Sequence, residues 1–149
     1  MRIADLMTDQ VVSASAHATL AEVGELMRDR NVGSVVILDE GSRPAALITD
    51  RDLALAVAAD GVDRGDEVGR YATRPLVTAD AEMDLEEAAA LMVQHHIRRL
   101  PVVNGAELAG IVTIDDIAVR AGDLQLAQQM TAEVAKSALP EFFFHQRGG

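Results

Sequence analysis

Two apolar runs decide the fold of this chain: residues 97–103, IRRLPVV, and residues 110–117, GIVTIDDI. Each run is short and almost continuously apolar, which is typical of a buried strand. The dipeptide Asn104-Gly105 follows the first run and is a strong signal for a tight hairpin turn. The second run contains Thr-x-x-Asp near its end, a pattern that starts helices. Together these features predict a strand, a turn, a second strand and a helix.

The first half of the chain repeats this stretch. Residues 33–38, GSVVIL, and residues 46–53, ALITDRDL, again combine two apolar runs with Thr-x-x-Asp. A shift of 65 positions also brings an upstream helical stripe, Leu20, Val23 and Met27, onto Leu85, Ala88 and Met92. A repeat of this length is one supersecondary unit used twice. Two copies predict a pseudo-symmetric pair in which each copy buries the apolar face of the other.

The repeat, the Arg-Arg-Leu-Pro-Val run and the two Thr-x-x-Asp patterns resemble the cystathionine-β-synthase-type (CBS) domain. In tandem they resemble a stand-alone CBS-domain pair, also called a Bateman module, over about residues 1–120. The resemblance implies an α+β fold of two βαββα repeats packed with pseudo-two-fold symmetry, with sheets inside and helices outside. We expect repeat 1 at residues 1–62, repeat 2 at residues 63–122, and a C-terminal helix with an apolar tail at residues 123–149.

The remaining elements are predicted from periodicity and caps. In repeat 1 we expect strands at residues 11–13, 35–38 and 45–48, a helix capped by Thr19, and a helix at residues 50–59. In repeat 2 we expect a strand at residues 75–78 and a helix at residues 85–95 capped by Asp84. Beyond these, Asp123 is expected to cap a last helix that buries Ala127, Met130 and Val134 and ends before Pro140.

The composition argues against several classes of function. The 149 residues carry a net charge of −11, from 13 basic and 24 acidic side chains. An acidic surface repels nucleic acid and anionic lipid, so we expect neither as a partner. The absence of cysteine excludes disulfides, thiolate chemistry and cysteine zinc sites. Neither a signal peptide nor an 18-residue apolar run is present, so we expect a cytoplasmic protein without a membrane span.

The candidate ligand-binding residues follow from the resemblance. By itself, Thr-x-x-Asp at a strand-to-helix turn is explained by helix capping, and the similar pattern at Thr19 implies no site. In CBS domains, however, this Asp binds ribose and the Thr helps to hold phosphate or ribose. Carried over to this sequence, Thr49 and Asp52 serve one cleft, and Thr113 and Asp116 serve the other.

Three arginines are the candidate phosphate ligands. Arg99, with Arg98 beside it, stands where similar domains carry a phosphate-binding arginine, and Arg51 lies inside the first Thr-x-x-Asp turn. A helix start beside them also favours an anion. The alternative for Arg98 and Arg99 is a surface role in ion pairs.

The two clefts are expected to differ. Asp115 lies inside the second Thr-x-x-Asp turn and opposes a phosphate there, while Ala46 replaces the glycine found at Gly110 and crowds the first site. The resemblance implies that early strand residues of each repeat line the cleft of the other. These are residues 77–80, Thr78 among them, for the Asp52 cleft and residues 11–14 for the Asp116 cleft.

The sequence does not favour a metal site or an enzyme. His95 and His96 are neighbours on a helix and do not face each other, so they are poor joint ligands, and no third ligand has a recognisable spacing. No nucleophile–base pair, phosphate-loop glycine signature or carboxylate pair is evident from spacing. We therefore expect no metal, no resident cofactor and no catalytic activity.

The expected function is a regulatory module that senses an adenine nucleotide or another adenosyl ligand in clefts between the repeats. Candidate ligands are AMP, ADP, ATP and S-adenosylmethionine. The alternative is a non-binding pair that serves as a dimerisation or docking scaffold. No effector domain accompanies the repeats, so we expect the regulated protein to be a separate chain. Alanine-rich faces at residues 53–59 and 85–92 predict a homodimer through close helix packing.

The C-terminal tail contains every phenylalanine of the chain, Phe142, Phe143 and Phe144. Three exposed aromatic side chains would promote aggregation, so burial is expected. The tail is predicted to pack on its own module or on a second subunit. The alternative is a docking peptide for another protein.

Overall fold

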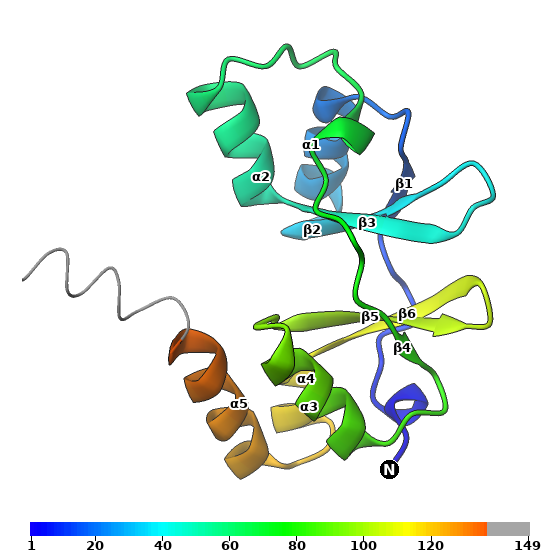
Figure 1. Ribbon diagram of the computed structural model, residues 1–149, viewed down its shortest axis with the longest axis vertical. Helices are drawn as coiled ribbons and strands as arrows, with labels where there is room; N and C mark the ends of the chain where they lie inside the picture. The colour runs from blue at the N-terminus through cyan, green and yellow to red at the C-terminus, as the bar shows by residue number, and fades with distance from the viewer. Residues whose placement is uncertain (137–149) are drawn as a thin grey trace, which may run out of the picture. The chain divides into compact units, whose positions relative to one another are not determined.

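The computed structural model describes residues 1–136, which form two compact units. Among the described residues, unit 1 contains Met1–Asp9, Val77–Asn104 and residues 109–136, and unit 2 contains Gln10–Leu76 and Gly105–Leu108. In each unit the helices lie on one face of a three-stranded sheet (Figure 1). The predicted α+β class, with two sheets each followed by helices, is confirmed.

The sheet of unit 2 has the order β1-β2-β3. Strand β1 (Ser13–Ser15) pairs in parallel with β2 (Ser34–Leu38), which pairs antiparallel with β3 (Pro44–Thr49). Helix α1 (Leu20–Arg30) connects β1 to β2, as a parallel pair requires. After β3, helix α2 (Asp50–Ala54) continues directly as a π-helical segment, η2 (Leu55–Ala59).

Helix α1 begins and ends where its caps predict. Thr19 Oγ1 accepts a hydrogen bond from the backbone N–H of Glu22 at 3.1 Å, and Asn31 ends the helix in the left-handed conformation with φ 54°. Its buried stripe packs with alternate residues of β2 and β3 into the core of unit 2. The central members of this core are Leu20, Val23, Met27, Val35, Ile37, Ala46 and Ile48.

The sheet of unit 1 has the order β4-β5-β6. It contains β4 (Ala79–Asp80), β5 (Arg99–Asn104) and β6 (Glu107–Thr113), and the tight turn predicted between β5 and β6 is present with Gly105 at φ 65°. Helix α3 (Leu85–Gln94) connects β4 to β5, and α4 (Ile114–Val119) follows β6. A further helix, α5 (Leu124–Lys136), packs against α3 and α4.

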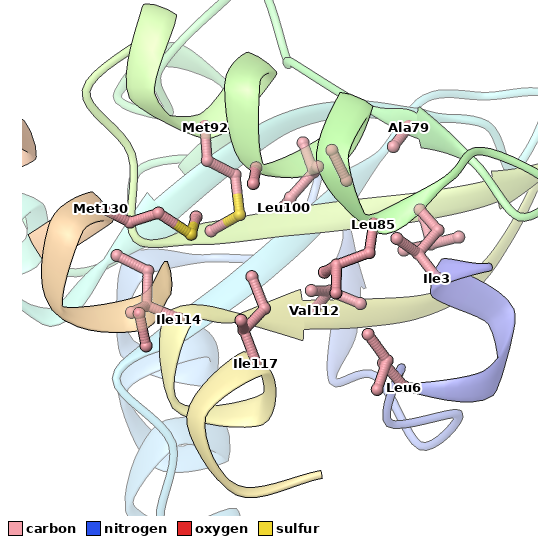
Figure 2. Packing of buried hydrophobic residues seen from close by; sticks show 14 of the residues in the cluster. Ile3, Leu6, Ala79, Leu85, Met92, Leu100, Val112, Ile114, Ile117 and Met130 are labelled. Atoms are coloured by element: carbon pink, nitrogen blue, oxygen red, sulfur yellow. The ribbon is translucent and has the colours of Figure 1, made fainter. Parts of the chain in front are cut away.

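Helix α5 contributes to the core of unit 1 as its periodicity predicts. Asp123 Oδ1 accepts a hydrogen bond from Leu126 N at 3.0 Å, which confirms the predicted cap, and Ala127, Met130 and Val134 are buried. Figure 2 shows the side chains of Met92 and Met130 pointing toward one another between α3 and α5. The predicted helix end before Pro140 and the three phenylalanines lie outside the described residues.

Each repeat is preceded by a segment, called its lead, that pairs with the sheet of the other repeat. The segment around η1 (Ile3–Asp5) belongs to unit 1, where Thr8 forms an antiparallel bridge with Ile111 of β6. The segment around η3 (Val68–Arg70) belongs to unit 2, where Thr73 forms the same kind of bridge with Leu47 of β3. The lead of repeat 1 therefore belongs to the unit that contains repeat 2, and the lead of repeat 2 belongs to the unit that contains repeat 1.

Backbone hydrogen bonds explain why the leads bind there. The first N–H groups of a helix have no partner within the helix. In α1 they donate to the lead of repeat 2, from Leu20 N to Asp66 O at 3.0 Å and from Ala21 N to Arg64 O at 2.9 Å. In α3, Leu85 N donates to Met1 O at 2.9 Å. Each lead thus supplies carbonyl groups that the helix of the other repeat needs.

Three local expectations are wrong. The strands expected at residues 11–13 and 75–78 lie at residues 13–15 and 79–80, because pairing with β2 and β5 sets their position. In addition, the side chain of Asp84 makes no capping hydrogen bond, although Asp84 is the N-cap residue of α3. A lead carbonyl satisfies the first N–H of α3 instead.

Candidate functional site

Both Thr-x-x-Asp turns form a reciprocal capping box at the end of a strand. In unit 2, Thr49 Oγ1 accepts from Asp52 N at 3.2 Å, while Asp52 Oδ2 accepts from Thr49 N at 2.9 Å. In unit 1, Thr113 Oγ1 accepts from Asp116 N at 3.1 Å, and Asp116 Oδ2 accepts from Thr113 N at 2.9 Å. Each box fixes an Asp carboxylate at a strand-to-helix turn with one oxygen committed to the backbone.

The second carboxylate oxygen differs between the two turns. Asp116 Oδ1 lies 3.5 Å from Nε of Arg120, one helical turn further on. Across residues 1–136, no cation is within ion-pair distance of Asp52. Asp52 Oδ1 is therefore available to accept hydrogen bonds from a diol, whereas Asp116 Oδ1 has a cation beside it. Arg120 was not singled out from the sequence, although its i+4 spacing from Asp116 is a recognised ion-pair signal.

The predicted phosphate ligands lie on different elements near these turns. Ile114 N donates to Arg98 O at 3.1 Å, so the start of β5, with Arg98 and Arg99, lies beside the start of α4. Arg98 is exposed and Arg99 is half-buried. Arg51 is exposed on α2, next to its turn. Thr78 is half-buried in unit 1, whereas its predicted partner Asp52 belongs to unit 2, so their joint role stays a prediction.

An acidic residue also lies inside the first turn. A Cβ atom at Gly33 would lie 3.3 Å from Asp50 Oδ2, so the Asp50 carboxylate rests against Gly33 at the start of β2. In the second turn the additional carboxylate is that of Asp115, which is exposed. Both turns therefore carry a second carboxylate, and the extra charge does not distinguish one from the other.

Gly110 has a packing role that its neighbours in the sequence do not predict. A Cβ atom at this position would lie 2.5 Å from Met7 Sδ and 2.8 Å from Thr8 O, because the lead of repeat 1 crosses β6 there. In unit 2 the corresponding residues are Ala72 of the other lead and Ala46 of β3, which is fully buried in the core. A large lead residue thus faces a glycine in one unit, and a small one faces an alanine in the other.

Residues 1–136 were also compared with the requirements of a metal site and of a membrane span. No group of three or more His, Asp or Glu side chains within residues 1–136 is placed to hold a metal ion. In the same range, none of the helices has the length and apolarity that a membrane span requires. His17 has a raised pKa because its ring nitrogens lie 3.2 Å from Glu67 Oε2 and 3.3 Å from Glu40 Oε1.

The fold and the two turns define a class: a tandem α+β repeat protein in which each repeat ends a strand in a Thr-x-x-Asp capping box. The family profile of the CBS domain matches residues 3–59 and again residues 68–122. The chain belongs to the CBS domain family and contains two copies of the domain.

Two similar proteins match this chain over nearly their whole length. CBS domain-containing protein YhcV of Bacillus subtilis is 39% identical over 137 residues, which cover 92% of this chain and 91% of the relative. The structure of CBS domain protein PAE2072 from Pyrobaculum aerophilum, complexed with AMP, superposes with a TM-score of 0.74 at 31% identity. That match covers 86% of this chain and 99% of the other.

A third similar protein carries metal. Hypoxic Response Protein I was solved with two coordinated zinc ions, and its structure superposes with a TM-score of 0.72 at 31% identity. The match covers 79% of this chain and 97% of the other chain. A protein of nearly the same name, Hypoxic response protein 1 of Mycobacterium tuberculosis, is 30% identical over 136 residues, 91% of this chain and 95% of that relative.

Proposed function

We propose that this protein is a regulatory module that binds an adenosyl ligand, with AMP as the first candidate, and that it is not an enzyme. The observation that carries the proposal is the repeated capping box, which fixes the carboxylates of Asp52 and Asp116 at equivalent turns. A carboxylate is a strong acceptor for the two hydroxyl groups of a ribose. Candidate ligands are AMP, ADP, ATP and S-adenosylmethionine.

The phosphate is assigned to the arginines. Arg99 and Arg98 start the strand beside α4, and Arg51 lies in the first turn. A guanidinium group binds phosphate by two parallel hydrogen bonds as well as by charge. The hydroxyl groups of Thr49, Thr113 and Thr78 are further candidates for contact with phosphate or ribose. The AMP complex of PAE2072, at 31% identity, supports AMP as the first candidate.

A second candidate function is a scaffold whose turns bind nothing. The contact between Arg120 and Asp116 favours it, because a carboxylate with a local partner gains less from a ligand. Both functions are compatible with a homodimer and with a separate regulated protein, which we propose as the partners of this module. The two functions differ in whether nucleotide is bound.

Titration with nucleotide tests the proposal. Calorimetry with AMP, ADP, ATP, S-adenosylmethionine and adenosine should give heat for at least one ligand. Ligand at about 100 times its dissociation constant should add ~2.7 kcal/mol to the free energy of unfolding. For a chain of this length that corresponds to a melting shift of roughly 5–10 °C. Arg99→Ala should weaken phosphorylated ligands more than adenosine.

The site variants should be Asp52→Asn and Asp116→Asn. Both carboxylates are half-buried parts of a capping box, so substitution by alanine would lower the free energy of unfolding by about 0.5–2 kcal/mol. Asparagine keeps an acceptor for the cap and removes the charge. Glu22→Gln is the matched control, because Glu22 has the same position in α1, where no ligand is proposed. No heat with any of the five ligands, or full binding by the double Asp variant, would refute the proposal.

A further inference from the structure

Arg120 connects the Asp116 turn to the lead of repeat 1. Its Nε atom lies 3.5 Å from Asp116 Oδ1, and its Nη1 atom donates to Met7 O at 3.1 Å and to Leu6 O at 3.4 Å. The side chain of Asp116 is only 16% exposed and that of Arg120 is 49% exposed, so the pair is partly shielded from water. Arg120 therefore holds three acceptor groups at once, one on α4 and two on the lead.

Both oxygens of the Asp116 carboxylate are engaged as a result. Oδ2 accepts from the backbone N–H of Thr113 at 2.9 Å and from its hydroxyl group at 3.1 Å, while Oδ1 faces Arg120. A ribose diol that approaches Asp116 must compete with a guanidinium group for Oδ1. The approach is unfavourable unless Arg120 moves or shares the oxygen.

Within residues 1–136, the turn of unit 2 has no equivalent of this cation. The residue four positions after Asp52 is Ala56, which is buried in the core of unit 2. Of the two Asp52 oxygens, only Oδ2 has a hydrogen-bond partner within residues 1–136. The two turns are alike in backbone and cap, and they differ in whether a cation already occupies the carboxylate.

We propose that Arg120 ranks the two sites, that is, it sets the order in which they bind ligand. A ribose-containing ligand occupies the Asp52 site first, and it occupies the Asp116 site only by displacing Arg120 from that carboxylate. This inference rests on the proposed function, since it concerns the same two carboxylates. It adds that ligand at Asp116 loosens the lead, because the guanidinium group that leaves Oδ1 also holds the carbonyl groups of Leu6 and Met7.

The size of the effect follows from the exposure of the pair. Partly exposed ion pairs contribute about 0.2–1 kcal/mol, which corresponds to a change in affinity of up to roughly fivefold. Removing Arg120 should therefore tighten the Asp116 site by about 1.4- to fivefold and leave the Asp52 site unchanged. High salt should reduce the difference, because it screens the pair in the free protein.

The experiment measures binding at each site alone by removing the carboxylate charge of the other site. Calorimetry with AMP is carried out on Asp52→Asn, which leaves the Asp116 site, and on Asp116→Asn, which leaves the Asp52 site. Arg120→Gln is then added to each. The matched control is Arg28→Gln, because Arg28 is an exposed helix arginine whose ion-pair partner is the adjacent Asp29. We expect tighter binding only when Arg120→Gln is combined with Asp52→Asn.

A second measurement needs no substitution at Arg120. The NMR signal of its Nε–H group should shift when AMP saturates the Asp52→Asn protein, since the carboxylate partner changes. Equal affinity with and without Arg120→Gln, or a signal that stays in place at saturation, would overturn the ranking and leave the proposed function intact. If AMP binds to none of the proteins, the ranking is rejected, and the proposed function is rejected only when ADP, ATP, S-adenosylmethionine and adenosine also give no heat.

Discussion

At the scale of single residues, Gly110 and Met7 form a size-matched pair. Gly110 is buried on β6, and the first carbon of any larger residue would overlap Met7 and the carbonyl oxygen of Thr8. Thr8 and Ile111 exchange two backbone hydrogen bonds of 2.9 Å across this contact. The close approach of the lead to β6 therefore depends on the absence of a side chain at position 110.

Gly110→Ala should lower the free energy of unfolding by about 1–3 kcal/mol, the usual cost of overpacking. Adding Met7→Ala should restore part of this loss, because the thioether clash disappears while the contact with Thr8 O remains. Denaturant titration of the two single variants and the double variant measures the coupling. Gly41→Ala is the control: Gly41 is exposed between β2 and β3, an added Cβ there would meet its nearest atom, Asp39 Oδ1, at 3.4 Å, and the change should stay within about 0.5 kcal/mol. Additive losses at Gly110 and Met7 would contradict the pairing.

At the scale of elements, His17 joins three segments of unit 2. It lies in the loop between β1 and α1, Glu40 lies in the turn between β2 and β3, and Glu67 directly precedes η3. The hydrogen bond to Glu67 is the main cause of the raised pKa of His17, followed by the one to Glu40. Both carboxylates favour the charged imidazolium.

The stabilisation by His17 should therefore depend on pH. Because its pKa in the folded protein is raised above 6.5, the contribution is fully present below pH 6.5 and is lost as the pH rises through the folded pKa. The melting temperatures of the parent and of His17→Gln should differ between about pH 5 and 6.5 and converge at alkaline pH. His95→Gln is the control. A difference that persists unchanged at pH 9 would show that His17 acts by packing rather than by charge.

Local patterns predicted most of the elements but not how they are exchanged. The caps at Thr19, Thr49 and Thr113 were predictable because each depends on residues three positions apart. The short strands β1 and β4 were misplaced by two to four residues, because their position depends on pairing with β2 and β5 rather than on their own sequence. The exchange of the leads depends on contacts between residues far apart in the chain, such as Leu85 and Met1.

The same reasoning applies to the candidate site. Spacing and resemblance predicted both Asp carboxylates and their threonines. Arg120 was not predicted because it lies one helical turn beyond the Thr-x-x-Asp pattern, although its i+4 spacing from Asp116 is visible in the sequence. The steric reason for Gly110 was not predictable, because Met7 precedes it by more than a hundred residues. Asp50 was missed because its approach to Gly33 depends on how β2 and β3 pair.

At the scale of the whole molecule, the helix faces of the two units are covered differently. In unit 1, α5 packs over α3 and α4 and adds Ala127, Met130 and Val134 to the core. In unit 2, α1 and α2 border an apolar groove of about 320 Å³ whose walls include Ala21, Gly24 and Val57. Small residues let helix backbones approach closely, so this face suits a second copy of the chain.

We therefore predict a homodimer that forms through the α1/α2 face of unit 2. The parent protein should sediment at twice the chain mass of 15.9 kDa at micromolar concentration. Val57 is 41% exposed beside the groove, which Arg64 also lines, and Val57→Lys should give a monomer, because a second cation buried beside Arg64 is left unpaired. Val119→Lys is the control, since Val119 is 80% exposed on α4 of unit 1, and it should stay dimeric. A monomeric parent would refute the dimer, and dissociation by Val119→Lys alone would place the interface on unit 1.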